Sequence, residues 1–230
     1  MRTLLWDVPM LLPFTPDQFL AVFAAYNLAV WPAQLVAYLL GLGMVLALLR
    51  PTVWTHRIVG AGLGLMWVWT GVAYHVLFFA SINKAAHAFA ALFVVQGLLF
   101  AHAALLRFDL RFTRTHGLRA WLGWLLIAYS ALIHPLIGFA GNGYPAMPMF
   151  GITPCPVTLF SFGVLLMAQD PVPRRLLAIP FVWALVGGSA ALLLAVPQDW
   201  PLLANGLLAV PWLWRHPANG RHARPWISRT

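Results

Sequence analysis

Long stretches without charge are the feature of this sequence that most limits its fold. Residues 120–169 contain no Asp, Glu, Lys or Arg. The chain as a whole is 62% hydrophobic and 8% charged, whereas an ordinary soluble domain is about 45–50% apolar and about 25% charged. Such a chain cannot cover a water-facing surface, so we expect an all-α, polytopic membrane protein.

Seven segments are candidate transmembrane helices, each near the roughly 20 residues that a hydrocarbon core requires. Four are long apolar runs, at residues 32–49, 58–80, 85–106 and 118–140. The other three, of which the first and last are short and contain proline, are residues 154–169, 176–196 and 200–214. The predicted architecture is one helical bundle over residues 1–214, in which residues 1–31 form an outer N-terminal segment.

The basic residues predict the orientation of this bundle. Seven spans place Arg2 and Lys84 on one side, and the other twelve basic residues on the opposite side. By the positive-inside rule the N-terminus is outside and the basic tail, residues 215–230, is cytoplasmic. The same rule explains the formal charge of +9, so we expect the lipid bilayer as partner and no nucleic acid. The twelve residues are Arg50, Arg57, Arg107, Arg111, Arg114, Arg119, Arg174, Arg175, Arg215, Arg221, Arg224 and Arg229.

The N-terminal segment contains a sequence pattern typical of the start of a helix. Thr15 can cap a helix, Pro16 suits its first turn, and Gln18 completes a capping box three residues after the cap. The apolar side chains that follow lie largely along one side. We therefore predict a short helix in the outer membrane interface.

The stretch at residues 138–156 breaks regular structure, since it holds eight Gly or Pro among nineteen residues. It precedes a span of only sixteen residues, about 24 Å of helix, against a hydrocarbon core of about 30 Å. We therefore predict that the turn at residues 153–156 lies below the outer surface. There it faces a protein-lined cavity shared with His75 and His134, since irregular backbone at membrane depth needs protein or a polar cavity around it.

These considerations define a candidate pocket for a small solute. Its predicted residues are His75, His134, Tyr144, Thr153, Cys155 and Thr158. Thioether, thiolate and imidazole groups together suit a soft metal ion. The metal version of the site is His75, His134, Met147, Met149 and Cys155. The plain alternative is an uncharged loop packed over the bundle, with Cys155 as a small buried hydrophobe.

Function is less constrained than fold. The leading hypothesis is binding or transport of a small solute or soft metal through an outward-facing pocket, rather than an enzyme, and no catalytic residue stands out. One alternative is a redox subunit that holds haem or quinone near His75 and His134, although no Cys-x-x-Cys-His motif is present. Another is a non-catalytic accessory subunit. The cofactor stays unspecified. The predicted spans contain no carboxylate, which weakens ion-coupled transport.

Several short motifs resemble an uncharacterised family of bacterial multi-pass inner-membrane proteins, catalogued as a domain of unknown function. The resemblance extends over nearly the whole chain and implies a single domain in a bacterial inner membrane. It implies no activity and no site residue. The motifs are Leu12-Pro13-Phe14-Thr15-Pro16, Ala24-Ala25-Tyr26-Asn27, Gly71-Val72-Ala73-Tyr74-His75, Gly143-Tyr144-Pro145, Thr153-Pro154-Cys155-Pro156 and Gly187-Gly188-Ser189-Ala190.

Overall fold

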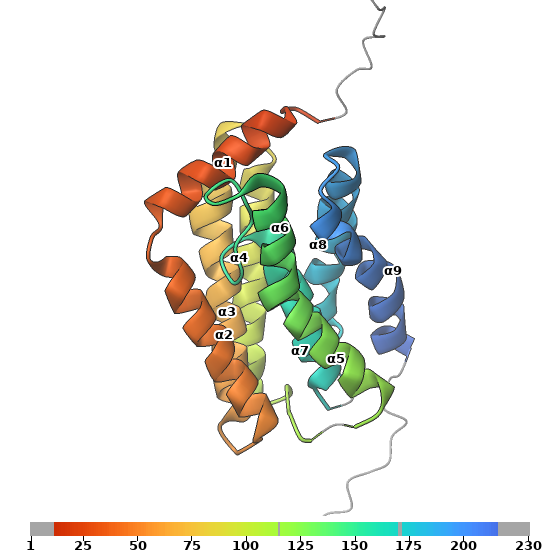
Figure 1. Cartoon of the computed structure of the whole chain (residues 1–230). Coiled ribbons are helices and arrows are strands. Elements are labelled where there is room, and N and C mark those ends of the chain that lie inside the picture. The colour runs from red at the N-terminus through yellow and green to blue at the C-terminus, as the bar shows by residue number, and fades with distance from the viewer. Residues whose placement is uncertain (1–11, 115, 170–171, 216–230) are drawn as a thin grey trace, which may run out of the picture.

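The computed structural model describes residues 12–114, 116–169 and 172–215 (Figure 1). The predicted tail beyond residue 215 and the first eleven residues of the outer segment lie outside these ranges. The described chain is helical, and its one β-type contact is an isolated bridge between Phe112 and Ala168. The helices are α1 (Pro16–Ala29), α2 (Ala33–Leu49), α3 (Thr55–Trp69), α4 (Ala86–His102), α5 (Leu118–Ala128), α6 (His134–Asn142), α7 (Pro154–Met167), α8 (Arg175–Leu193) and α9 (Trp200–Arg215).

Short segments of other helix types extend or join these helices. A π-helical segment, Thr70–Val76, continues α3, and a second, Ala103–Arg107, continues α4. A third, Tyr129–Ile133, joins α5 to α6. Two 3-10 turns, Phe79–Ser81 and Pro197–Asp199, follow α3 and α8.

Four continuous helices are long and apolar enough to cross a membrane: Thr55–Ser81, Ala86–Arg107, Leu118–Asn142 and Arg175–Leu193. Each overlaps a predicted span. Helices α1 and α2 count as a fifth candidate only if they are taken together, and they are bent by 84°. The span predicted at residues 154–169 is the shorter apolar helix α7. The described residues thus support four or five spans, and the count of seven stays a prediction.

The predicted helix start at the N-terminus is confirmed. The Gln18 backbone N–H donates to the Thr15 hydroxyl at 3.2 Å, and the Thr15 backbone N–H donates to the Gln18 side chain at 2.9 Å. This reciprocal capping box begins α1 at Pro16. Helix α1 lies across one end of the bundle, and α2 then runs along it (Figure 1).

From α2 onward, with α5 and α6 taken as the one continuous helix that they form, successive helices run in opposite directions, so the loops gather at two ends of the bundle (Figure 1). One end carries the described connecting residues 50–54, 108–114, 116–117, 168–169 and 172–174 and is rich in arginine. There Arg119 donates to the carbonyl oxygens of Leu166 and Ala168, both at 2.9 Å, and so satisfies the last carbonyls of α7. The other end, called the pocket end below, carries α1 and the connections 77–85, 143–153 and 194–199.

Helix α7 occupies the middle of the bundle. Every residue of it is buried except Cys155, which is partly buried. Its 14 residues correspond to about 21 Å of helix, since each residue adds about 1.5 Å. Contacts with α3, α5, α8 and α9 surround it. A helix that is apolar on all sides is expected to be enclosed in this way.

The irregular loop before α7, residues 143–153, folds into the bundle. Ile152 and Thr153 are 3% and 0% exposed. Its backbone groups are paired by side chains of α1: Tyr26 donates to the Ile152 carbonyl at 2.8 Å, and Asn27 donates to the carbonyls of Pro145 and Met147 at 2.8 and 2.7 Å. Burial of this loop is possible because α1 supplies these partners.

Small residues and a few hydrogen bonds hold the long helices together. A Cβ atom on Gly64 of α3 would lie 2.9 Å from the carbonyl oxygen of Gly97 on α4, so these two backbones pack in direct contact. The indole N–H of Trp67 on α3 donates to the Ser161 hydroxyl on α7 at 2.8 Å. These contacts join α3 to α4 and α7, and the pocket described next lies where the continuation of α3 meets the first turns of α4 and α7.

Candidate functional site

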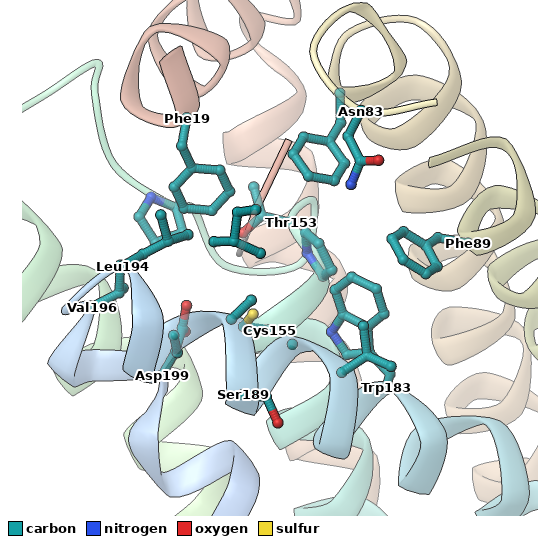
Figure 2. A pocket seen from close by; sticks show the side chains of 18 of the residues that line it. Phe19, Asn83, Phe89, Thr153, Cys155, Trp183, Ser189, Leu194, Val196 and Asp199 are labelled. Atoms are coloured by element: carbon teal, nitrogen blue, oxygen red, sulfur yellow. The ribbon is translucent and has the colours of Figure 1, made fainter. Parts of the chain in front are cut away.

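A cavity of about 490 Å³ opens at the pocket end of the bundle (Figure 2). It lies between α1 on one side and the second half of α8 on the other, with the ends of α3, α4 and α7 between them. Its walls are mostly apolar. Seven aromatic residues line it, namely Phe14, Phe19, Phe23, Tyr74, Phe79, Phe89 and Trp183, and aliphatic residues of the segment 185–196 complete the wall.

The polar groups of the cavity are few. Asn83 and Ser189 lie in its walls, and Thr153, Cys155 and Asp199 lie close together between α7 and the end of α8 (Figure 2). The Cys155 thiol and the Asp199 carboxylate lie near each other in this lining. An apolar pocket with a small group of converging polar side chains is the usual form of a small-molecule site.

Asp199 also forms a buried pair with His134. Nε2 of His134, at the start of α6, lies 2.5 Å from Oδ1 of Asp199, and the two side chains are 0% and 6% exposed. Nδ1 of the same imidazole is buried without a hydrogen-bond partner among the described residues. The pair extends the polar group of the cavity from α7 to α6.

Asp199 is the functional candidate that sequence reasoning missed. It lies in the 3-10 turn between the predicted sixth and seventh spans, so a search for carboxylates inside spans passes over it. The sequence does contain a pattern that could have identified Asp199. The chain has five acidic residues in all, and this one directly precedes an apolar run. Acidic residues at membrane depth are rare and mostly functional.

His75 occupies a separate aromatic cage beside the cavity. It belongs to the π-helical continuation of α3, a type of irregularity that often marks functional positions. Its ring is fully buried, and neither nitrogen has a hydrogen-bond partner among the described residues. Five rings surround it with centroids 4.8–6.0 Å away, those of Tyr74, Phe79, Phe89, Phe93 and Trp183. All except Phe93 also line the cavity.

The predicted pocket residues are only partly brought together. Thr153 and Cys155 line the cavity, and His134 reaches it through Asp199. Thr158 is buried inside α7, where its hydroxyl donates to the Pro154 carbonyl at 2.8 Å. Tyr144 is 46% exposed and makes a long contact of 3.4 Å with the Asn27 carbonyl. Neither Thr158 nor Tyr144 lines the cavity.

The predicted soft-metal ligands are dispersed. Met147 is buried and Met149 packs among apolar side chains around α1. Within residues 12–114, 116–169 and 172–215, no three His, Cys, Asp or Glu side chains form a group suited to a metal ion. Ligation of haem by both imidazoles would require His134 to leave Asp199 and His75 to leave its aromatic cage.

Comparison with known proteins gives a family but no activity. A family model described as a family of unknown function (DUF6064) matches residues 16–223. This match confirms the resemblance drawn from the sequence motifs to an uncharacterised family. No curated protein and no solved structure matches the chain.

Proposed function

The chain belongs to the DUF6064 family, and we propose that it is a multi-pass membrane protein that binds a small, largely apolar solute in the cavity at its pocket end. The observation that carries the proposal is the cavity itself, whose aromatic and aliphatic walls converge on Thr153, Cys155 and Asp199. Apolar walls favour an apolar solute body, and a few polar groups fix its orientation.

The arginine distribution supports an outward-facing pocket. Arg50, Arg111 and Arg174 all belong to connections at the arginine-rich end, which the positive-inside rule assigns to the cytoplasm. The proposed arrangement therefore has seven spans in a bacterial inner membrane. Helix α1 lies along the outer surface, and the cavity opens on that side.

Binding of a solute is better supported than its transport through the bundle. Below Cys155 the middle of the bundle is filled by α7, whose remaining residues are buried. A solute that entered from the pocket end would meet these packed apolar side chains before it reached the arginine-rich end. Transport would thus require movement of α7 against its neighbours, whereas binding requires only the cavity as it stands.

A lipid-soluble quinone in the same cavity is the second candidate function. The indole N–H of Trp183, which lines the cavity, is buried, and the Cys155 thiol lies near it. A quinone carbonyl could accept from this N–H group. An absorption spectrum and an organic extract of the protein purified from membranes test this candidate, since a bound quinone would be recovered in the extract.

The proposed function is tested through Cys155, the only cysteine of the chain. We expect N-ethylmaleimide to modify it in the folded protein and fluorescein maleimide, which is much larger, to react poorly. The variant Ala190→Trp fills the cavity from α8 and should slow the reaction with N-ethylmaleimide at least about tenfold. Ala178→Trp is the matched control, since Ala178 is an exposed residue of the same helix.

The outcomes separate a pocket from its alternatives. Reaction of Cys155 with both reagents at similar rates would make its surroundings an open surface. Reaction with neither reagent in the folded protein, followed by full reaction after denaturation, would show sealed packing. Either result would overturn the proposed pocket. Melting temperatures of both tryptophan variants close to that of the unchanged protein establish that they fold.

A further inference from the structure

We propose that the cavity selects a small lipophilic cation, an organic ammonium ion whose positive charge is balanced by Asp199. This inference rests on the proposed function and names the chemical class of its ligand. It is argued from the charge of the cavity, the hydrogen bonding of Asp199 and the aromatic character of the walls.

The cavity carries one charged side chain among the described residues. Asp199 lies in its lining, and no Lys or Arg does. Lys84 is the one described basic residue at the pocket end, and it is exposed and outside the cavity lining. The other described arginines lie at the arginine-rich end. The field inside the cavity therefore has the sign of a carboxylate if Asp199 is ionised.

The surroundings of Asp199 favour the ionised carboxylate beside a neutral imidazole. Nδ1 of His134 has no hydrogen-bond partner in the described part of the chain, so a proton there would be a buried donor without an acceptor among those residues. Two protonation states place a proton on Nδ1. One is the imidazolium, and the other is the neutral tautomer whose Nε2 accepts a hydrogen bond from a protonated Asp199. The remaining state, in which Nε2–H donates to the carboxylate, leaves no N–H group unpaired.

This state leaves a net charge of −1 in a cavity with mostly apolar walls. A buried carboxylate without a compensating positive charge is costly, even when it accepts a hydrogen bond from His134. A bound cation would supply that compensation. A neutral solute that only donates a hydrogen bond would leave the charge in place, and an anion would be repelled.

The walls supply the second element of cation recognition. Aromatic ring faces attract ammonium groups, more strongly when the group is desolvated, and aromatic cages are the common site for quaternary ammonium ligands. Phe19, Phe89 and Trp183 come from α1, α4 and α8 and stand around the cavity that Asp199 also lines (Figure 2). A ligand with an apolar body and one positive charge matches both the walls and the carboxylate.

The test compares two probes that have the same shape and differ in charge. Phenyltrimethylammonium is a cation, and tert-butylbenzene has a carbon in place of its nitrogen. The measured quantity is protection of Cys155, given as the ratio of its N-ethylmaleimide rates without and with probe in the same detergent. We expect phenyltrimethylammonium to protect Cys155 and tert-butylbenzene to protect it at least about tenfold less well at equal free concentration.

Two variants keep the result interpretable. Asp199→Asn removes the charge and retains the shape, and it should abolish the preference for the cation. Phe19→Leu removes one ring and should weaken protection by the cation more than protection by the neutral probe. Because protection is a ratio within one variant, a change in the intrinsic reactivity of Cys155 cancels. If Asp199→Asn does not fold, the effect of Phe19→Leu on protection by the two probes tests the cation assignment.

The inference and the proposed function fail in different ways. Equal protection by both probes, or a cation preference that survives Asp199→Asn, would overturn the cation assignment while the pocket remains. Lack of reaction between N-ethylmaleimide and Cys155 in the absence of any probe would instead overturn the pocket. Loss of the cation preference in Ala190→Trp, but not in Ala178→Trp, would place the bound cation in this cavity.

Discussion

His134 and Asp199 are 65 residues apart in the sequence, and their side chains approach to 2.5 Å in the interior of the protein. The contact joins the start of α6 to the turn between α8 and α9. It therefore holds the α8–α9 hairpin, one wall of the cavity, against the helix that follows α5. The same two side chains set the charge of the cavity and the position of its wall.

Replacement of both partners of this pair should cost less stability than the two single replacements cost in sum. In His134→Leu the buried carboxylate loses its nitrogen donor, and the free energy of unfolding should fall by about 3–5 kcal/mol. The double variant His134→Leu, Asp199→Asn should be less destabilised than the sum of the two single variants. Unfolding in mixed detergent micelles, analysed as a double-mutant cycle, measures this coupling. Additive effects would show that the contact contributes little.

Gly151 should not tolerate a side chain. Its φ is +76°, and a Cβ atom there would lie 2.7 Å from the Cβ of Ala37 on α2. Both backbone strain and the clash would therefore destabilise Gly151→Ala, by about 1–3 kcal/mol from the strain alone. Gly141→Ala is the control, because Gly141 lies in α6 with no atom within 4 Å of an added Cβ. Equal melting temperatures of the two variants would contradict the described loop.

The hydroxyl of Tyr26 should matter more than that of Tyr144. Tyr26 donates to the Ile152 carbonyl in a buried hydrogen bond and accepts from the Trp69 indole in a part-buried one, both at 2.8 Å. Tyr26→Phe leaves both partners unsatisfied and should lower the free energy of unfolding by about 1–3 kcal/mol. Tyr144→Phe removes only a long contact of a half-exposed ring and should be nearly neutral. Similar losses from both substitutions would argue against the role assigned to Tyr26.

Orientation in the membrane can be read with single cysteines introduced into a Cys155→Ala chain. Lys84 is exposed at the pocket end and Arg114 is exposed at the arginine-rich end, so Lys84→Cys and Arg114→Cys report on the two ends. We expect a membrane-impermeant maleimide to label position 84 in intact spheroplasts and position 114 only after permeabilisation, as the positive-inside rule requires. The reverse pattern would invert the proposed topology. Labelling of both from one side would contradict an antiparallel arrangement across the membrane.

The features predictable from sequence are those that depend on local pattern. The capping box at Thr15 fixes the start of α1 because its hydrogen bonds are local. Three of the four long apolar runs, at residues 58–80, 85–106 and 118–140, match continuous helices that are long and apolar enough to cross a membrane, whereas the run at 32–49 counts only together with α1. The proline and glycine content before residue 154, with the short helix after it, indicated the buried loop. In each case the physical cause acts within some twenty residues of the chain.

The features that escaped prediction depend on which helices become neighbours. The angle of 84° between α1 and α2 is set by packing across the bundle end. Asp199 became a site residue only because α6 brings His134 to it. His75 was expected to share a cavity with His134, but rings from α4 and α8 enclose it instead. The spacing of residues in the sequence does not predict which of these helices pack against one another.

The enclosure of α7 has a consequence for how the protein is made. A translocon releases a nascent helix into lipid according to its own length and apolarity, and α7 is too short to bridge the hydrocarbon core alone. The proline-containing turn before it also carries backbone groups that lipid cannot satisfy. In the proposed membrane arrangement, α7 would therefore reach its enclosed position only after α8 and α9 have been made. In that arrangement residues 175–215 would complete the enclosure of the central helix.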